Sequence, residues 1–293
     1  MQGWPPTVIV ALVWSLLPLF AFGFAGDQII RAVHRLPISA QLVLPSIFGI
    51  PYWLVARSVT NVRGGWLAFY LMFPVVVTVL LWRAKQNDPQ QRGNWRDLTV
   101  LLVLGLAVDL RWFEAAWPAH LIVVSKLILL DGGLYGFLVI RQLTNLGFDL
   151  WARKEDLRIG LRELIFYAPI AVPLGIALGF LHWHAYLPRP GEAALAWVFT
   201  FVFIAIPEEI YFRGWIQNLI ERRLGRRSST WLTALIFGLS HFNKRAAHFN
   251  WRYVLLATLA GIFYGRAWRQ QHRVAASAIT HACVDAVWSI WLR

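Results

Sequence analysis

The sequence predicts an all-α protein that crosses a membrane as a polytopic helical bundle with about eight to ten membrane segments. Of its 293 residues, 58% are hydrophobic and only 15% are charged, whereas about a quarter of the residues in a soluble domain are charged. Apolar runs close to the roughly 20 residues that a helix needs to cross the hydrocarbon core recur along the whole chain.

The apolar segments follow one another without a linker long enough to separate soluble domains. The second segment is short and holds Pro45 and Pro51, so we expect a partial or re-entrant element there. The eighth is also short, which is why the number of crossings is put at about eight to ten. The segments are 7–25, 42–56, 66–82, 98–117, 120–140, 164–183, 195–220, 231–243, 253–268 and 275–292.

Basic residues set the expected orientation in the membrane. The net charge of +13 arises from Lys and Arg in short connections between apolar segments, a pattern typical of membrane topology rather than of nucleic-acid binding. Sixteen of them fall in the connections 83–97, 141–162, 221–229 and 266–273, and six fall on the other side. The positive-inside rule places the first set in the cytoplasm and the C-terminus on the opposite face.

Two adjacent carboxylates, Glu208 and Glu209, lie in the middle of an apolar segment. Carboxylates at membrane depth are costly and normally face a bundle interior or a water-filled cavity, so they mark a candidate functional site. Glu209 and Arg213 are four residues apart and are expected to form an ion pair on one helix face. Glu208 is rotated from Glu209 by about 100° and has no cation at this spacing, which favours a role as general base.

Two histidines in later apolar segments complete the candidate site. Phe237 precedes His241 by four residues and shares its helix face, as a pocket wall would. His281 and Asp285 are also four residues apart, and a carboxylate beside an imidazole can fix the tautomer and orientation of the ring. From their depths in their segments, Glu208, His241 and His281 are expected to line one cavity in the cytoplasmic half of the bilayer.

Two mechanisms fit these residue types. A buried Glu and His can hold a water and remove its proton, while a second His donates a hydrogen bond to the oxyanion that forms on an attacked carbonyl. Zinc is the other possibility, although the helical H-E-x-x-H pattern is absent. Hydrolysis with no cofactor and a zinc site both stay open, and the zinc ligands would be Glu208, His241, His281 and Asp285.

Three motifs occur in order on successive predicted helices: E-E-x-x-x-R at Glu208, Glu209 and Arg213, F-x-x-x-H at Phe237 and His241, and H-x-x-x-D at His281 and Asp285. Together they resemble the family of CAAX prenyl endopeptidases and bacteriocin-processing proteins, called CPBP or Abi, which includes the type II CAAX proteases. The resemblance implies a catalytic transmembrane bundle over residues 160–293. It leaves 1–159 as N-terminal transmembrane helices of unassigned role.

An intramembrane glutamate-type protease is what the resemblance implies. Glu208 and His241 would activate water, and His281 with Asp285 would form the oxyanion site. The family's last motif often ends in Asn, whose amide can donate a hydrogen bond to an oxyanion. An ionised Asp cannot donate one, so Asp285 would have to be protonated, orient His281 or bind a metal.

The other predicted site residues have supporting roles. Glu209 and Arg213 are assigned to structural support, and Phe237, Phe212 and Trp215 to a substrate pocket. The expected partners are the lipid bilayer and a membrane-anchored protein or peptide substrate, with no nucleic acid. The expected location is the bacterial inner membrane, with the active site opening to the cytoplasmic half. Two alternatives from other classes are a non-catalytic immunity or scaffold protein of the membrane and a proton-coupled transporter.

Overall fold

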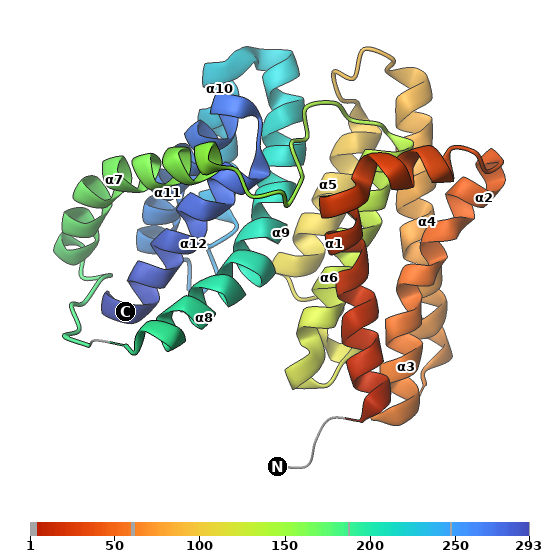
Figure 1. Ribbon diagram of the computed structural model, residues 1–293, viewed down its shortest axis with the longest axis horizontal. Coiled ribbons are helices and arrows are strands. Elements are labelled where there is room, and N and C mark those ends of the chain that lie inside the picture. Colours follow the sequence, from red (N-terminus) through yellow and green to blue (C-terminus); the bar gives the residue numbers. More distant parts are fainter. Residues whose placement is uncertain (1–4, 60–61, 187, 247, 293) are drawn as a thin grey trace. The chain divides into compact units, whose positions relative to one another are not determined.

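The computed structural model describes residues 5–59, 62–186, 188–246 and 248–292, and every regular element in that part of the chain is a helix (Figure 1). The predicted all-α class is confirmed. Contacts between Cα atoms divide the chain into an N-terminal unit, Met1–Thr144, and a C-terminal unit, Asn145–Arg293. The predicted functional boundary between residues 159 and 160 falls inside a helix, Lys154–Ala177, and it stays a prediction.

The chain is a multi-pass membrane protein. Among the described residues, seven helical runs are long and apolar enough to cross a membrane, which is slightly below the predicted number of about eight to ten. Helix α5 (Trp95–Asp109) has only 15 residues, and α11 (Trp251–Gln271) carries three arginines. The predicted segments 195–220 and 231–243 lie in one helical run, Pro190–Leu239, whose backbone turns sharply at Gly225, so this single run contains both predicted segments.

The N-terminal unit is built around one central helix, α6 (Ile122–Leu134), which continues as the π-helical stretch Tyr135–Ile140. Around it the chain forms α1 (Pro6–Val33), α2 (Ile38–Val43), α3 (Ile50–Ser58), α4 (Gly64–Asn87) and α5. The segment predicted as partial, near Pro45 and Pro51, is instead long enough to cross, because α2, a 3-10 stretch and α3 follow one another over Ile38–Ser58. Each of these prolines is the second residue of its helical stretch, in the first turn, where its missing N–H costs little.

A buried ion network joins α6 to the start of α5. Arg141 is fully buried, and its Nε lies 2.9 Å from Oδ1 of Asp97, which is also fully buried. Its Nη2 lies 2.6 Å from Oδ2 of Asp88, in the connection after α4. Partial burial of Asp88 opposes its ionisation, but hydrogen bonds from the backbone N–H groups of Arg92 and Gly93 and from Arg141 hold its pKa below the usual value. The stability that this carboxylate contributes is therefore present at neutral pH and lost as the pH falls through the lowered pKa.

The Arg141→Ala variant is expected to lower the free energy of unfolding by about 3–5 kcal/mol, because it leaves the buried carboxylate of Asp97 without its cation. Thermal unfolding of the purified protein in detergent measures the loss. The matched control is Arg83→Ala, since the exposed Arg83 stacks on Trp82 at 4.9 Å and should change the stability by about 0.5 kcal/mol or less. Similar melting temperatures for both variants would contradict the role given to Arg141.

The C-terminal unit contains α7 (Lys154–Ala177), α8 (Pro190–Thr200), α9 (Ile206–Glu209), α10 (Asn218–Leu239), α11 and α12 (Val274–Trp291). In Figure 1, α8 and α9 lead directly into α10. The turns between them are π-helical, over Phe201–Ala205 and Ile210–Gln217, and such turns occur often at functional sites. Helix α10 changes direction at Gly225, whose φ of 78° lies in the left-handed region that glycine adopts readily.

Small residues let α10 and α11 pack closely. A Cβ atom on Gly261 of α11 would lie 2.9 Å from the Cα of Ala234 on α10, so no larger residue fits there without a shift. Close backbone approach through small residues is typical of membrane helices. Their proximity brings the ring of Tyr264 on α11 to 5.7 Å from that of Phe237 on α10.

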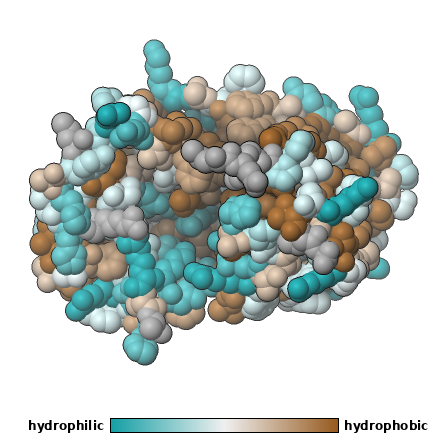
Figure 2. Space-filling model, turned by 90° about the horizontal axis from the view of Figure 1, so that it is seen from below, coloured by the Kyte–Doolittle hydropathy of each residue, from teal (hydrophilic) through white to brown (hydrophobic). Residues whose placement is uncertain are grey.

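Apolar side chains also cover much of the surface. Figure 2 shows hydrophobic side chains reaching one face of the molecule in several patches between hydrophilic ones. Large apolar residues in the predicted spans are well exposed, among them Leu195 at 71% and Ile165 at 67%. Such exposure would be costly in water, and it is expected where a helix faces lipid.

Candidate active site

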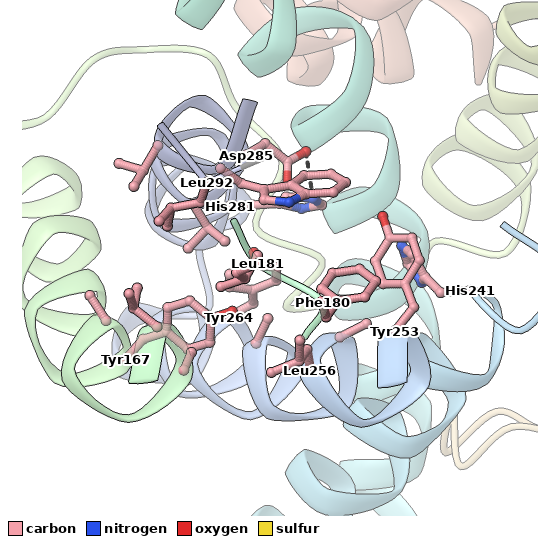
Figure 3. A pocket seen from close by; sticks show the side chains of 18 of the residues that line it. Tyr167, Phe180, Leu181, His241, Tyr253, Leu256, Tyr264, His281, Asp285 and Leu292 are labelled. Atoms are coloured by element: carbon pink, nitrogen blue, oxygen red, sulfur yellow. Dashed lines mark ion pairs between the residues drawn. The ribbon is translucent and has the colours of Figure 1, made fainter. Parts of the chain in front are cut away.

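The four residues predicted to carry the chemistry meet at one cavity of about 300 Å³ in the C-terminal unit. Glu208 comes from α9, His241 from the turn after α10, and His281 and Asp285 from α12. Figure 3 shows Asp285 joined to His281 and shows His241 beside Tyr253. The rest of the wall is mainly apolar and aromatic. It includes Leu164, Tyr167, Phe180, Leu181, Tyr253, Leu256, Tyr264, Val284, Trp288 and Leu292.

His281 lies between three carboxylates. Its Nδ1 is 2.9 Å from Oε1 of Glu209, which is fully buried. Its Nε2 is 3.6 Å from Oδ2 of Asp285 and 3.9 Å from Oε2 of Glu208. The side chains of Glu208 and Asp285 are each 29% exposed, so this ring nitrogen faces the part of the site that water can reach. The ring also stacks on Tyr264, with centroids 4.6 Å apart.

Glu209 joins His281 to a buried cation. The Nε of Arg213 lies 3.1 Å from Oε2 of Glu209, and both side chains are completely buried. Three aromatic rings surround the guanidinium, with centroids 5.1 Å (Phe237), 5.7 Å (Tyr264) and 5.9 Å (Phe212) from its central carbon. A buried charge is costly unless it is paired. The ion pair and the rings together therefore stabilise the buried carboxylate of Glu209 in contact with Nδ1 of His281.

The geometry of His241 fixes which of its ring nitrogens serves as the acceptor. Nδ1 lies 2.8 Å from the backbone carbonyl oxygen of Phe237. A carbonyl only accepts hydrogen bonds, so Nδ1 carries the proton and Nε2 has the free lone pair of a neutral imidazole. The rings of Phe237 and Tyr253 flank it at 4.8 and 4.7 Å. Ser240 donates its hydroxyl to the same Phe237 carbonyl at 2.8 Å.

The predicted substrate pocket is present only in part. Phe237 lines the cavity, whereas Phe212 and Trp215 are not among its lining residues. Phe212 packs edge-on against Phe237 at 5.0 Å, and Trp215 is only 1% exposed. The prediction assumed 3.6 residues per turn throughout, but the helix is π-helical from Ile210 to Gln217. The wider turn changes the angle between residues, so a spacing of four or seven residues no longer places Phe212 and Trp215 on the face of Glu208.

The cavity also lies further along the helices than expected. The sequence predicted that the helix carrying His241 begins at Trp231, which would place His241 close to the basic connection 221–229. In the structure α10 resumes directly after Gly225, so His241 lies about 22 Å along the helix from Arg226. His241 and the lining residues Leu181 and Leu292 all follow the ends of their helices. The structure therefore does not support a cavity opening beside the basic connections.

Two features of the site were missed from the sequence. The contact between His281 and Glu209 joins residues 72 positions apart, and no local spacing indicates it. Helix α11 supplies Tyr253 and Tyr264 to the cavity, although it carries no motif. Among the described residues, no group of three or more His, Cys, Asp or Glu is arranged to hold a metal ion, and the zinc alternative stays an untested prediction.

Comparison with known protein families identifies the C-terminal unit. A family model described as type II CAAX prenyl endopeptidase Rce1-like matches residues 190–287. Residues 190–287 are therefore similar to this family, and we refer to them as the Rce1-like segment. It contains all three motifs and every candidate catalytic residue, so the resemblance drawn from those motifs is confirmed. No curated protein and no solved structure matches the chain. The Rce1-like match indicates a membrane-embedded protease.

The Arg213→Ala variant is expected to lower the free energy of unfolding by about 3–5 kcal/mol, because Glu209 would stay buried without its cation. Glu208→Ala should cost about 1 kcal/mol or less, since that side chain is partly exposed. Thermal unfolding in detergent compares the two. Adding Glu209→Gln to Arg213→Ala removes the stranded charge and should recover part of the loss. Equal melting temperatures for the two single variants would contradict the support role of Arg213.

Proposed function

We propose that the C-terminal unit is an intramembrane endopeptidase that hydrolyses a peptide bond of a membrane-anchored protein or peptide. The observation that carries the proposal is that two carboxylates and two imidazoles meet in one apolar-walled cavity. All four groups belong to the motifs inside the Rce1-like segment. Such a cavity can hold an extended peptide and a water molecule together while excluding bulk solvent.

Glu208 and His241 are the groups proposed to activate water. The side chain of Glu208 lines the cavity, is 29% exposed and lies 3.9 Å from Nε2 of His281. Nε2 of His241 is the acceptor nitrogen of its ring. A water held between them can lose its proton as its oxygen attacks the peptide carbonyl. The proton then passes to the leaving amine as the C–N bond breaks, which leaves both residues in their starting states.

His281 is proposed to stabilise the oxyanion of the tetrahedral intermediate. As an imidazolium it donates from both nitrogens: from Nδ1 to Glu209, and from Nε2 into the cavity. A donor that is already oriented before the reaction stabilises developing charge most effectively. Asp285 is an acceptor when ionised, so we assign it to holding the imidazolium rather than to donating to the oxyanion.

The family match and the motifs suggest substrate classes for this site. The family name points to a prenylated C-terminal CAAX tail. In a bacterial inner membrane, which we propose as the location, a leader peptide or a C-terminal sorting helix is the corresponding membrane-anchored substrate.

The Glu208→Gln variant is expected to lower product formation by about 100-fold or more, because the amide cannot take a proton from water. Comparing protein termini in membranes from cells with the wild-type protein and cells with the variant measures this. New termini that appear only with the wild type would support the protease and identify its substrate.

Equal sets of termini, with both proteins expressed at the same level, would contradict the protease. The scaffold alternative then predicts that Glu208→Gln has no effect in the cell. A proton-coupled transporter predicts altered uptake without any new terminus.

Oγ of Ser240 also lies 3.2 Å from Nδ1 of His241, which raises the alternative of a serine nucleophile, and a pair of neighbouring variants tests it. Ser240→Ala should keep activity within about threefold of the wild type, because its hydroxyl is bonded to a backbone carbonyl. His241→Gln should lose activity by about 100-fold or more, as expected for a general base. Rates of fragment formation in membranes, normalised to protein amount, make the comparison. A Ser240→Ala loss as large as that of His241→Gln would reject the water mechanism.

A further inference from the structure

The cavity extends from the middle of the C-terminal unit, where His281 lies within α12, to one end of the unit, which we call the cavity end. Two backbone hydrogen bonds join the loop after α7 to the end of α12. The N–H of His182 donates to the carbonyl of Leu292 at 3.2 Å, and the N–H of His184 donates to the carbonyl of Trp291 at 2.8 Å. The ring of Phe180 lies 5.2 Å from Tyr253 at the start of α11. Loop 240–250 joins α10 to α11 at this same end.

The opposite end of the unit holds the connections 145–162, 221–229 and 266–273, and we call it the basic end. Arg273 donates from Nε to Asp156 at 2.8 Å, which joins the start of α12 to the start of α7. Arg226 and Arg269 donate to each other's backbone carbonyls at 3.1 and 3.0 Å, which joins the bend of α10 to the end of α11.

The two ends are separated by the thickness of a membrane. Helix α12 runs from one to the other and has 18 residues, which is about 27 Å of helix. The hydrocarbon core of a bilayer is about 30 Å thick. When the unit crosses the bilayer, the two ends therefore lie at opposite faces.

Basic residues are distributed very unequally between these faces. The basic end carries eleven Lys and Arg residues, against four among the described residues of the cavity end, namely Arg189, Lys244, Arg245 and Arg252. Lys and Arg in short connections are retained in the cytoplasm, and nearby acidic residues change this little. The ion pairs of Arg273 and Arg226 therefore do not remove their contribution to orientation.

Two basic residues line the cavity at the cavity end. Lys244 and Arg245 of loop 240–250 are among its lining residues, and Arg245 is exposed with its guanidinium over the Trp288 ring at 3.9 Å. The side chain of Asn250 holds this loop by donating to the Lys244 carbonyl at 3.1 Å. Charged side chains beside an aromatic ring are typical of the membrane–water interface.

We infer that the cavity faces away from the cytoplasm and takes peptide segments that are presented on the extracytoplasmic face of the membrane. The side of opening follows from the fold and the basic residues alone, whereas the use of peptides as substrates rests on the proposed function. A prenylated tail that stays in the cytoplasm would not reach this opening. Leader peptides and sorting helices of exported proteins cross to that face and would reach it.

Cysteine labelling tests the side of opening without any assay of activity. Cys283 is the only cysteine, so Cys283→Ser gives a background without thiols. Ala246→Cys then places one thiol in the exposed loop at the cavity end, and Ser228→Cys places one in the exposed bend at the basic end. Both full-length variants are treated with a membrane-impermeant maleimide in spheroplasts and in inside-out vesicles. Detergent-solubilised samples show that each thiol is reactive.

The Ala246→Cys protein should be labelled at least tenfold more than the Ser228→Cys protein in spheroplasts, with the order reversed in inside-out vesicles. The opposite order, or labelling of both thiols from one side, would overturn the inference. Labelling does not require catalytic activity. The orientation can therefore be confirmed even if the comparison of protein termini finds no cleavage product. In that case only the protease proposal would fail.

Discussion

The candidate site depends on one buried ion pair, between Glu209 and Arg213, in the middle of an apolar helix. Neither charge is stable at this depth alone, so each requires the other. The aromatic rings of Phe237 and Tyr264 pack against the guanidinium, which supplies cation–π attraction where water is absent. With its charge held in place, Glu209 can bind Nδ1 of His281 from behind and turn the other ring nitrogen toward the cavity.

Close packing of α10 and α11 also positions an aromatic side chain beside His281 and Arg213. Close contact at Gly261 brings α11 against α10, and this places Tyr264 where it stacks on His281 and touches the guanidinium of Arg213. The fully buried Glu209 and the partly exposed Glu208 are adjacent in sequence but lie in different environments. These different environments fit the separate roles proposed for them, with Glu209 as the support and Glu208 as the reacting group.

Local spacing explains which parts of this site could be predicted from the sequence. The pairs Glu209–Arg213 and His281–Asp285 were predicted because residues four apart share a helix face. The contact between Glu209 and His281 depends on how distant helices pack, which no spacing reveals. Phe212 and Trp215 do not line the cavity, where the helix widens to π geometry after the acidic pair, and their part in a substrate pocket stays a prediction. The all-α class followed from composition, whereas the proline-rich span at Ile38–Ser58 was underestimated, since its prolines lie in the first turns of helical stretches.

The central claim is that Glu208 and His241 act together on one water, and a double-mutant cycle on the rate of fragment formation tests it most directly. The rates of Glu208→Gln, His241→Gln and the combined variant are compared with the wild type on one identified substrate. If the two groups act as a unit, the combined variant should be about as slow as the slower single variant. A combined loss equal to the product of the two single losses would show independent roles and would contradict the mechanism.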